Sequence, residues 1–180
     1  MAYFGEKLNT VGHLPIVSSL DAQSAPALRT LLWATEADTQ AWATALAAKP
    51  ELHNAIIELH GDLGAGKTTL VRHLLRALGV PGRIKSPSYA VLEPHDAPTA
   101  QGRLAISHFD FYRFSDPREW EDAGFRDTFT APGLKLVEWA DNARAALPVP
   151  DMAIHINAQT DDTRQARIEA FTATGKALLA

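Results

Sequence analysis

A glycine-rich segment in the first half of the chain has the residue types needed to hold a phosphate chain. Gly61–Thr68 reads GDLGAGKT and fits the pattern GxxxxGK[ST]. Glycines let successive backbone N–H groups curl around phosphate oxygens, because no Cβ obstructs them. Lys67, expected to face solvent, can reach the β- and γ-phosphates, and the Thr68 hydroxyl can ligate Mg²⁺. The segment predicts a bound nucleotide, but by itself it does not define a reaction.

Two carboxylates follow apolar segments further along the chain. Leu104–Phe109 ends at Asp110, and Leu134–Val137 ends at Glu138. In a parallel sheet such positions lie at the carboxyl edge of the strands, where ligands bind. A phosphate-binding loop at that edge needs acids to hold Mg²⁺ or to orient water. Strand-end acids can also be ordinary solvated residues, but the nearby loop favours the functional interpretation.

Three further features bear on the chemistry. Ser86–Tyr89 (SPSY) is either a switch segment whose hydroxyls meet the γ-phosphate or a plain strand-entry loop. His108 precedes Asp110 by two residues and could form a metal pair with it, but no third ligand cluster is visible, which favours a packed strand residue. The segment Asn-Lys-x-Asp, with which GTPases read guanine, is missing, and this favours ATP.

The elements around these residues alternate between strands and helices. A strand over Asn54–His60 precedes the glycine loop, and a helix over Lys67–Leu78 follows it, ended by Gly79 and Pro81. Glu93–Gly102 (EPHDAPTAQG) is predicted to be a loop. Further strands are predicted at Leu28–Trp33, Tyr89–Leu92, Leu104–Phe109, Leu134–Val137, Met152–Asn157 and Ala166–Phe171, and further helices from Thr35 to Lys49, from Asp116, and over Trp139–Ala146.

This order predicts one α/β domain of the P-loop NTPase type over residues 28–180. Its sheet should be mainly parallel and flanked by helices, with a C-terminal antiparallel hairpin joined by the turn Gln159–Thr163. Residues 1–27 show no clear period and are predicted to be an N-terminal extension or flexible arm.

Composition narrows the function classes. The chain has 180 residues, 46% apolar and 21% charged, so it can bury a core and is not globally disordered. It has no cysteine, which excludes disulfides, thiol catalysis and cysteine-based metal sites. No apolar run is long enough for a membrane span, so a cytoplasmic protein is expected. The net charge of −4 predicts that any nucleic acid is held by a partner.

Taken together, these segments resemble the TsaE family, the bacterial ATPases of tRNA threonylcarbamoyladenosine synthesis. The likeness spans about Trp33 to Leu179, and GDLGAGKTT combined with HFDFYR and LVEW makes it specific. The segments that carry it, in the order of the family, are Gly61–Thr69 (GDLGAGKTT), Lys85–Tyr89 (KSPSY), Glu93-Pro94, His108–Arg113 (HFDFYR), Asp116-Pro117, Glu119, Glu121, Gly124 and Leu136–Trp139 (LVEW).

The resemblance implies a small P-loop fold that hydrolyses ATP slowly in the presence of Mg²⁺. It implies work with TsaD and TsaB, which transfer the group onto adenosine of ANN-decoding tRNAs, so that tRNA is met only through the complex. By position it implies catalytic roles for Asp110 and Lys67, and a metal site at Thr68 and Glu138. The implied nucleotide-binding residues are Glu36, Leu63, Gly64, Ala65, Gly66, Lys67, Thr68, Thr69 and Asp110.

Some positions depart from the family or are only loosely placed by it. Ala140 stands where the family usually has proline, and Ser88 where it has threonine. Glu36 can equally be a first-turn helix acid, and the resemblance implies that a residue of the late turn, around Thr163 and Arg164, also reaches the nucleotide. Two other functions are compatible with a phosphate-binding loop: a small-molecule P-loop kinase, which would need an arginine-rich lid, and a nucleotide-gated binding module.

Overall fold

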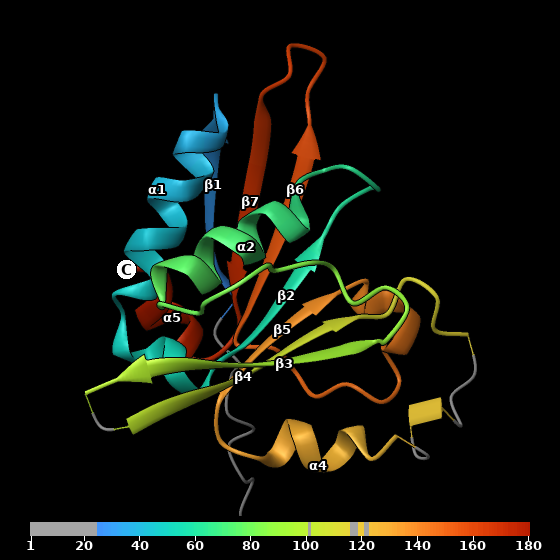
Figure 1. The fold of residues 1–180 in the computed structure, drawn as a ribbon. Coiled ribbons are helices and arrows are strands. Elements are labelled where there is room, and N and C mark those ends of the chain that lie inside the picture. Colours follow the sequence, from blue (N-terminus) through green and yellow to red (C-terminus); the bar gives the residue numbers. More distant parts are fainter. Residues whose placement is uncertain (1–24, 101, 116–118, 121–122) are drawn as a thin grey trace, which may run out of the picture.

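One sheet organises the part of the chain that the computed structural model describes, which is residues 25–100, 102–115, 119–120 and 123–180. The strand order is β1-β7-β6-β2-β5-β4-β3 (Figure 1). The strands are β1 Ala27–Trp33, β2 Ile56–His60, β3 Leu92–Thr99, β4 Gly102–Asp110, β5 Leu134–Glu138, β6 Met152–Ala158 and β7 Arg164–Ala170.

The centre of the sheet is parallel and its edges are antiparallel. Strands β6, β2, β5 and β4 run parallel to one another. Strand β7 returns antiparallel to β6, β1 pairs antiparallel with β7, and β3 pairs antiparallel with β4. The predicted fold class is therefore confirmed, including the C-terminal antiparallel hairpin.

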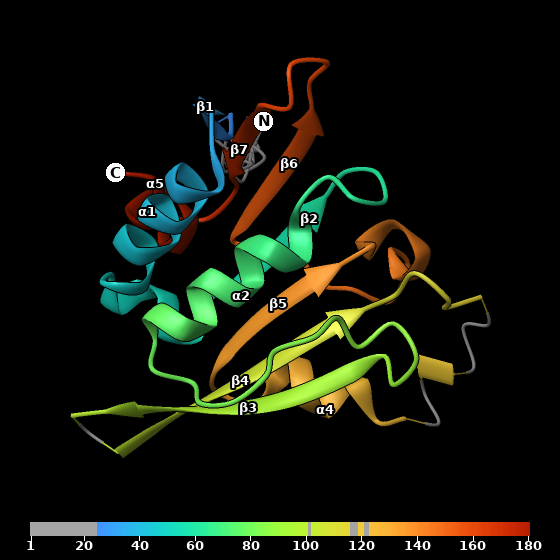
Figure 2. The ribbon, with the colours of Figure 1, turned by 45° about the horizontal axis from the view of Figure 1, so that its top comes forward.

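Helices cover both faces of this sheet. The α-helices are α1 Glu36–Ala47, α2 Lys67–Ala77, α4 Phe125–Thr130 and α5 Ala173–Leu179, and 3₁₀ turns lie at η1 Pro50–Asn54 and η2 Ala140–Ala143. Helices α2 and α4 lie on opposite faces (Figure 2). None of the helices in the described ranges has the length and apolarity needed to cross a membrane.

The core divides into two clusters because strand residues alternate between the faces. Ile106 and Leu136 belong to the cluster under α1 and α2, whereas Phe109 and Val137 belong to an aromatic-rich cluster with α4. Buried apolar side chains on both faces fix the register of β4 and β5. The ends of these two strands, and the acids there, are thereby held at one edge of the sheet.

The segment between α2 and β4 differs from the prediction. Tyr89 lies in a turn, so the strand predicted over Tyr89–Leu92 is wrong, and the loop predicted over Glu93–Gly102 is mostly strand β3. The loop was predicted because Pro94 and Pro98 disfavour a strand. Strand β3 is an edge strand, where a residue without an N–H group is tolerated, and Pro94 and Pro98 are both exposed.

The predicted helices agree only in part with those of the structure. The predicted helix over Trp139–Ala146 is only the 3₁₀ turn Ala140–Ala143. Helices α4 and α5 were not predicted, although Thr172 caps α5 by accepting a hydrogen bond from the Gly175 N–H group at 3.1 Å. The helix start predicted at Asp116 and the extension up to residue 24 lie outside the described residues, and Ala27 already belongs to β1.

An ion pair with a buried carboxylate joins strand β2 to Arg144, which follows the 3₁₀ turn η2. Glu58 on β2 is 2% exposed, and its two carboxylate oxygens accept hydrogen bonds from Arg144 at 2.8 and 2.6 Å. His60 lies 3.0 Å from the same carboxylate. Burial alone would raise the pKa of Glu58, but the hydrogen bonds from His60 and Arg144 lower it below its ordinary value.

We expect Arg144→Gln to lower the free energy of unfolding by about 2 kcal/mol near neutral pH, because a buried carboxylate loses both hydrogen bonds from Arg144. A lowered folded-state pKa stabilises the fold above about pH 4.3, and this contribution disappears as the pH falls through the folded value. The variant should therefore unfold at a higher pH during acid titration. Urea titrations at pH 7 and pH 4 measure both effects.

Arg167→Gln is the matched control, because Arg167 is about as exposed as Arg144 (50% against 44%), whereas the side chain of its partner Glu169 is 18% exposed, against 3% for Glu58. Such a pair contributes about 0–1 kcal/mol. Equal losses in the two variants would show that the Glu58 pair has no special weight.

Candidate active site

The glycine loop joins β2 to α2 at the carboxyl edge of the parallel strands. At Gly61, with φ of 135°, a Cβ would lie 2.2 Å from the Ile156 carbonyl oxygen, so only glycine fits there. Gly64 and Gly66 also have positive φ, but a Cβ at either would project into open space. The loop therefore leaves a cradle that side chains would fill, beside the first N–H groups of α2, which suits a phosphate chain.

Lys67 is 4% exposed, which corrects the expectation that it faces solvent. Its Nζ donates to the carbonyl oxygens of Gly61 and Asp62 at 2.5 and 2.9 Å and lies 4.1 Å from the ring centroid of Trp139. Burial lowers the pKa of Lys67, and the negative charges of Glu138, Asp110 and Asp62 oppose that shift. The ammonium group is thus held against its own loop beside the cradle.

Thr68 and Glu138 form a hydrogen-bonded pair next to this lysine. The Thr68 hydroxyl lies 2.9 and 3.0 Å from the two Glu138 carboxylate oxygens, to which it donates. A hydroxyl that donates its single proton keeps its lone pairs, so the Thr68 oxygen stays able to ligate a cation. The buried carboxylate beside it adds the oxygen chemistry that Mg²⁺ prefers. The predicted metal residues are therefore together, and their chemistry fits Mg²⁺.

Asp110 lies on the strand next to Glu138, at the paired register position. Its side chain is 3% exposed, and it accepts hydrogen bonds from the Ser86 hydroxyl and from the Tyr112 backbone N–H group at 2.9 Å. Ser86 thus ties the segment after α2 to the acid. A single pocket brings these predicted residues together, lined by Leu63, Gly64, Gly66, Lys67, Thr68, Thr69, Ser86, Ser88, Tyr89, Asp110, Tyr112, Arg113, Glu138 and Trp139.

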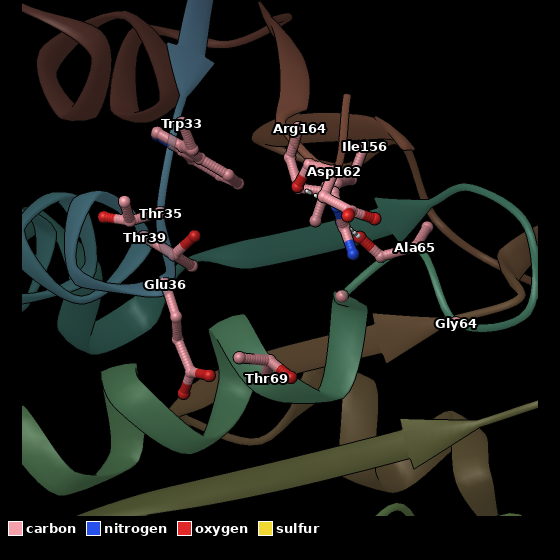
Figure 3. A pocket seen from close by; sticks show the side chains of 11 residues that line it. Trp33, Thr35, Glu36, Thr39, Gly64, Ala65, Thr69, Ile156, Asp162 and Arg164 are labelled. Carbon is pink, nitrogen blue, oxygen red and sulfur yellow. Dashed lines mark hydrogen bonds between the residues drawn. The ribbon is translucent and has the colours of Figure 1, made fainter. Parts of the chain in front are cut away.

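A second pocket lies on the other side of the glycine loop and shares Gly64, Gly66 and Thr69 with the first. Figure 3 shows Trp33 and Glu36 on one side of it and Arg164 on the other, with the Arg164 side chain reaching toward Ala65. Arg164 Nε donates to the Ala65 carbonyl oxygen at 3.2 Å. The structure therefore places Glu36 and Arg164 beside the loop, whereas Thr163 does not line this pocket.

Sequence reasoning missed several contacts made to the residues of this site. His73 on α2 lies 2.8 Å from the Glu36 carboxylate, and His108 lies 2.9 Å from that of Glu138. Trp139 has φ of 59°, a left-handed conformation that an L-residue adopts at a cost. His73 falls on the apolar face of its helix, and His108 falls within an apolar strand. A polar residue at a position predicted to be buried indicates a polar partner in the fold, and this pattern could have revealed both contacts.

The sheet order, the glycine loop between β2 and α2, and the acids that end β4 and β5 define a P-loop protein. Comparisons with known proteins then narrow the class. The profile described as "Threonylcarbamoyl adenosine biosynthesis protein TsaE" matches residues 33–166. The chain therefore belongs to the TsaE family of threonylcarbamoyladenosine biosynthesis proteins, as the resemblance of its motifs predicted.

Individual relatives agree with this assignment. The tRNA threonylcarbamoyladenosine biosynthesis protein TsaE of Haemophilus influenzae is 40% identical over 124 residues, which span 69% of this chain and 75% of that protein. Its namesake from Bacillus subtilis is 35% identical over 152 residues, spanning 82% and 89%. The crystal structure of Bacillus subtilis YdiB matches with a TM-score of 0.68 at 25% identity, covering 86% of this chain and 93% of that one.

Trp139 should report nucleotide binding by fluorescence. Lys67 Nζ lies over its ring, and phosphate would draw this ammonium group away and change the charge beside the indole. We expect ATP with Mg²⁺ to change the emission of the wild type, and most of that change to disappear in Trp139→Phe while ATP still binds. Trp33 lines the second pocket and can respond to the nucleoside itself, so the comparison is repeated with Trp33→Phe in both proteins. Trp42 and Trp120 supply background, and a full signal without Trp139 in that comparison would place the phosphates elsewhere.

Proposed function

We propose that this protein is the Mg²⁺-dependent ATP-binding and ATP-hydrolysing subunit of the complex that installs the threonylcarbamoyl group on adenosine of ANN-decoding tRNAs. The observation that carries the proposal is the Thr68–Glu138 pair beside the glycine cradle, in a chain of the TsaE family. A slow ATPase acting with TsaD and TsaB in the cytoplasm is the activity we assign to it, with tRNA reached through those partners.

The two pockets can accommodate the phosphates and the nucleoside of one bound nucleotide. The phosphates would lie in the cradle under Lys67, with Mg²⁺ held by Thr68 and Glu138. Mg²⁺, when bound, would neutralise developing phosphoryl charge. Asp110 would orient the attacking water or the γ-phosphate, and Ser86 holds that carboxylate in place. The nucleoside would enter the second pocket, where Trp33 offers an apolar wall and Glu36 a hydrogen-bond acceptor.

A reconstituted reaction tests this proposal. The protein is mixed with TsaD, TsaB, a donor of the threonylcarbamoyl group and an ANN-decoding tRNA, and the modified adenosine is counted per complex. Repeated turnover should require this protein and ATP. A non-hydrolysable ATP analogue that supports full turnover would leave the protein a nucleotide-gated binding module, and phosphate transfer to hydroxyl compounds would make it a kinase.

The lone protein should bind tRNA poorly, because its net charge is −4 and it offers no surplus of cations to track phosphates. A filter-binding titration at low and moderate salt measures this directly. Tight, salt-sensitive binding of tRNA by the lone protein would contradict the indirect role that we assign to it.

A further inference from the structure

A histidine with no assigned role touches the carboxylate at the centre of the site. His108 on β4 is fully buried, and its Nε2 lies 2.9 Å from Glu138 Oε1 on the neighbouring strand β5. Its side chain faces the same side of the sheet as Ile106 in the core under α2. It therefore approaches Glu138 from beneath the pocket, and it does not line the pocket itself.

The hydrogen-bond pattern fixes which ring nitrogen carries the proton. An ionised carboxylate can only accept, so the Nε2–H group of His108 donates to Glu138. The opposite nitrogen, Nδ1, is buried and has no hydrogen-bond partner among the described residues. A buried nitrogen without a hydrogen-bond partner lowers stability, and a leucine would fill similar space without that cost. The imidazole is therefore expected to serve through its bond to Glu138.

That bond divides the two carboxylate oxygens. Oε1 accepts from both His108 and Thr68, whereas Oε2 accepts from Thr68 alone at 3.0 Å. Oε2 therefore has more free lone-pair density than Oε1 with which to bind a cation. Glu138 also acts electrostatically on the buried Lys67 ammonium group. Without the Nε2 donor, the carboxylate would be free to turn toward that cation and away from Thr68.

We propose that His108 is a positioning residue that holds Glu138 in the orientation needed for Mg²⁺, and this inference rests on the proposed function. It touches neither nucleotide nor metal and acts through the carboxylate alone. Partners of this kind behind a metal ligand typically contribute about 10–100-fold to metal affinity.

The test compares nucleotide affinity with and without Mg²⁺ by calorimetry. His108→Leu removes the donor and should reduce the Mg²⁺-dependent gain in ADP affinity by about tenfold or more, while metal-free ADP affinity stays as in the wild type. His108→Gln can return an N–H group near the Nε2 position and should restore most of the gain. A merely structural role would change both affinities together.

His95→Leu is the matched control. His95 lies on β3, its ring is 6.5 Å from that of His108, and its own Nε2 is buried and unpaired among the described residues. Strand β4 separates it from Glu138, so this variant should keep the full Mg²⁺ effect. An equal loss of the Mg²⁺-dependent gain in ADP affinity in both leucine variants would show that His108 contributes only through packing.

A spectroscopic measurement on the unaltered protein keeps the inference testable if His108→Leu fails to fold. Long-range ¹H–¹⁵N spectra, with His108 assigned from His108→Gln, should show the tautomer protonated at Nε2, with a shift change on addition of Mg²⁺ and ADP. An Nδ1-protonated ring would overturn the inference. A wild type without any Mg²⁺ effect on nucleotide affinity contradicts the proposed function, whereas an intact effect in His108→Leu contradicts this inference alone.

Discussion

Lys67→Ala should lower ATP turnover by about 10²–10³-fold, because loss of one group acting on the transferring phosphoryl costs that much. Lys67 is the cation held beside the cradle, where burial already lowers its pKa and water competes little with a phosphate. Its present partners are two carbonyl oxygens of its own loop, which an incoming phosphate can replace. The measurement is phosphate release in the reconstituted complex, with saturating ATP.

The control for this variant is a second buried lysine. Lys135 is also 4% exposed and donates to carbonyl oxygens of Ala131 and Gly133, but it does not line the cradle. Lys135→Ala should keep ATP turnover, whatever it does to thermal stability. Turnover at the wild-type level in Lys67→Ala, or an equal loss in Lys135→Ala, would contradict the assignment of the cradle.

Asp110→Asn and Glu138→Gln should separate two functions that adjacent strands bring together. Both side chains are buried, so the amides keep the volume and change mainly the charge. If Asp110 orients water, Asp110→Asn should lower turnover about 10²-fold or more and leave ADP affinity nearly unchanged. If Glu138 holds Mg²⁺, Glu138→Gln should remove most of the Mg²⁺-dependent gain in nucleotide affinity.

These two variants are compared by single-turnover hydrolysis and by ADP titration with and without Mg²⁺. Thermal unfolding of each variant serves as the control for folding, because Asp110 holds Ser86 and Glu138 holds Thr68. Equal effects of both changes on metal-free ADP affinity would contradict the separate roles of Asp110 in orienting water and of Glu138 in binding Mg²⁺.

The sequence was sufficient for the parts of the site that local pattern controls. The glycine loop lies between a strand and a helix as predicted, and Asp110 and Glu138 end neighbouring parallel strands. Apolar runs that stop at one acid specify such strand ends, since each run can be buried only within the sheet. The pairing of β4 with β5 was not predicted, because the order of elements along the chain does not fix the order of strands in the sheet.

What the sequence could not provide depends on contacts between distant segments. Proline argues against a strand unless the strand is known to be at an edge, and the edge position of β3 follows only from the complete strand order. The burial of Lys67 depends on Trp139, which lies 72 residues away in the chain. The His108–Glu138 and His73–Glu36 contacts likewise join separate elements.

The most direct test of the central claim is an equilibrium titration of the wild-type protein with nucleotide. Calorimetry with ATP and Mg²⁺, with ATP and a chelator, and with GTP and Mg²⁺ measures stoichiometry, metal dependence and base preference in one series. We expect one ATP per chain, bound more tightly with Mg²⁺ than without it, and weaker binding of GTP. Absence of ATP binding, or an affinity that Mg²⁺ leaves unchanged, would contradict the proposed Mg²⁺-dependent ATP site.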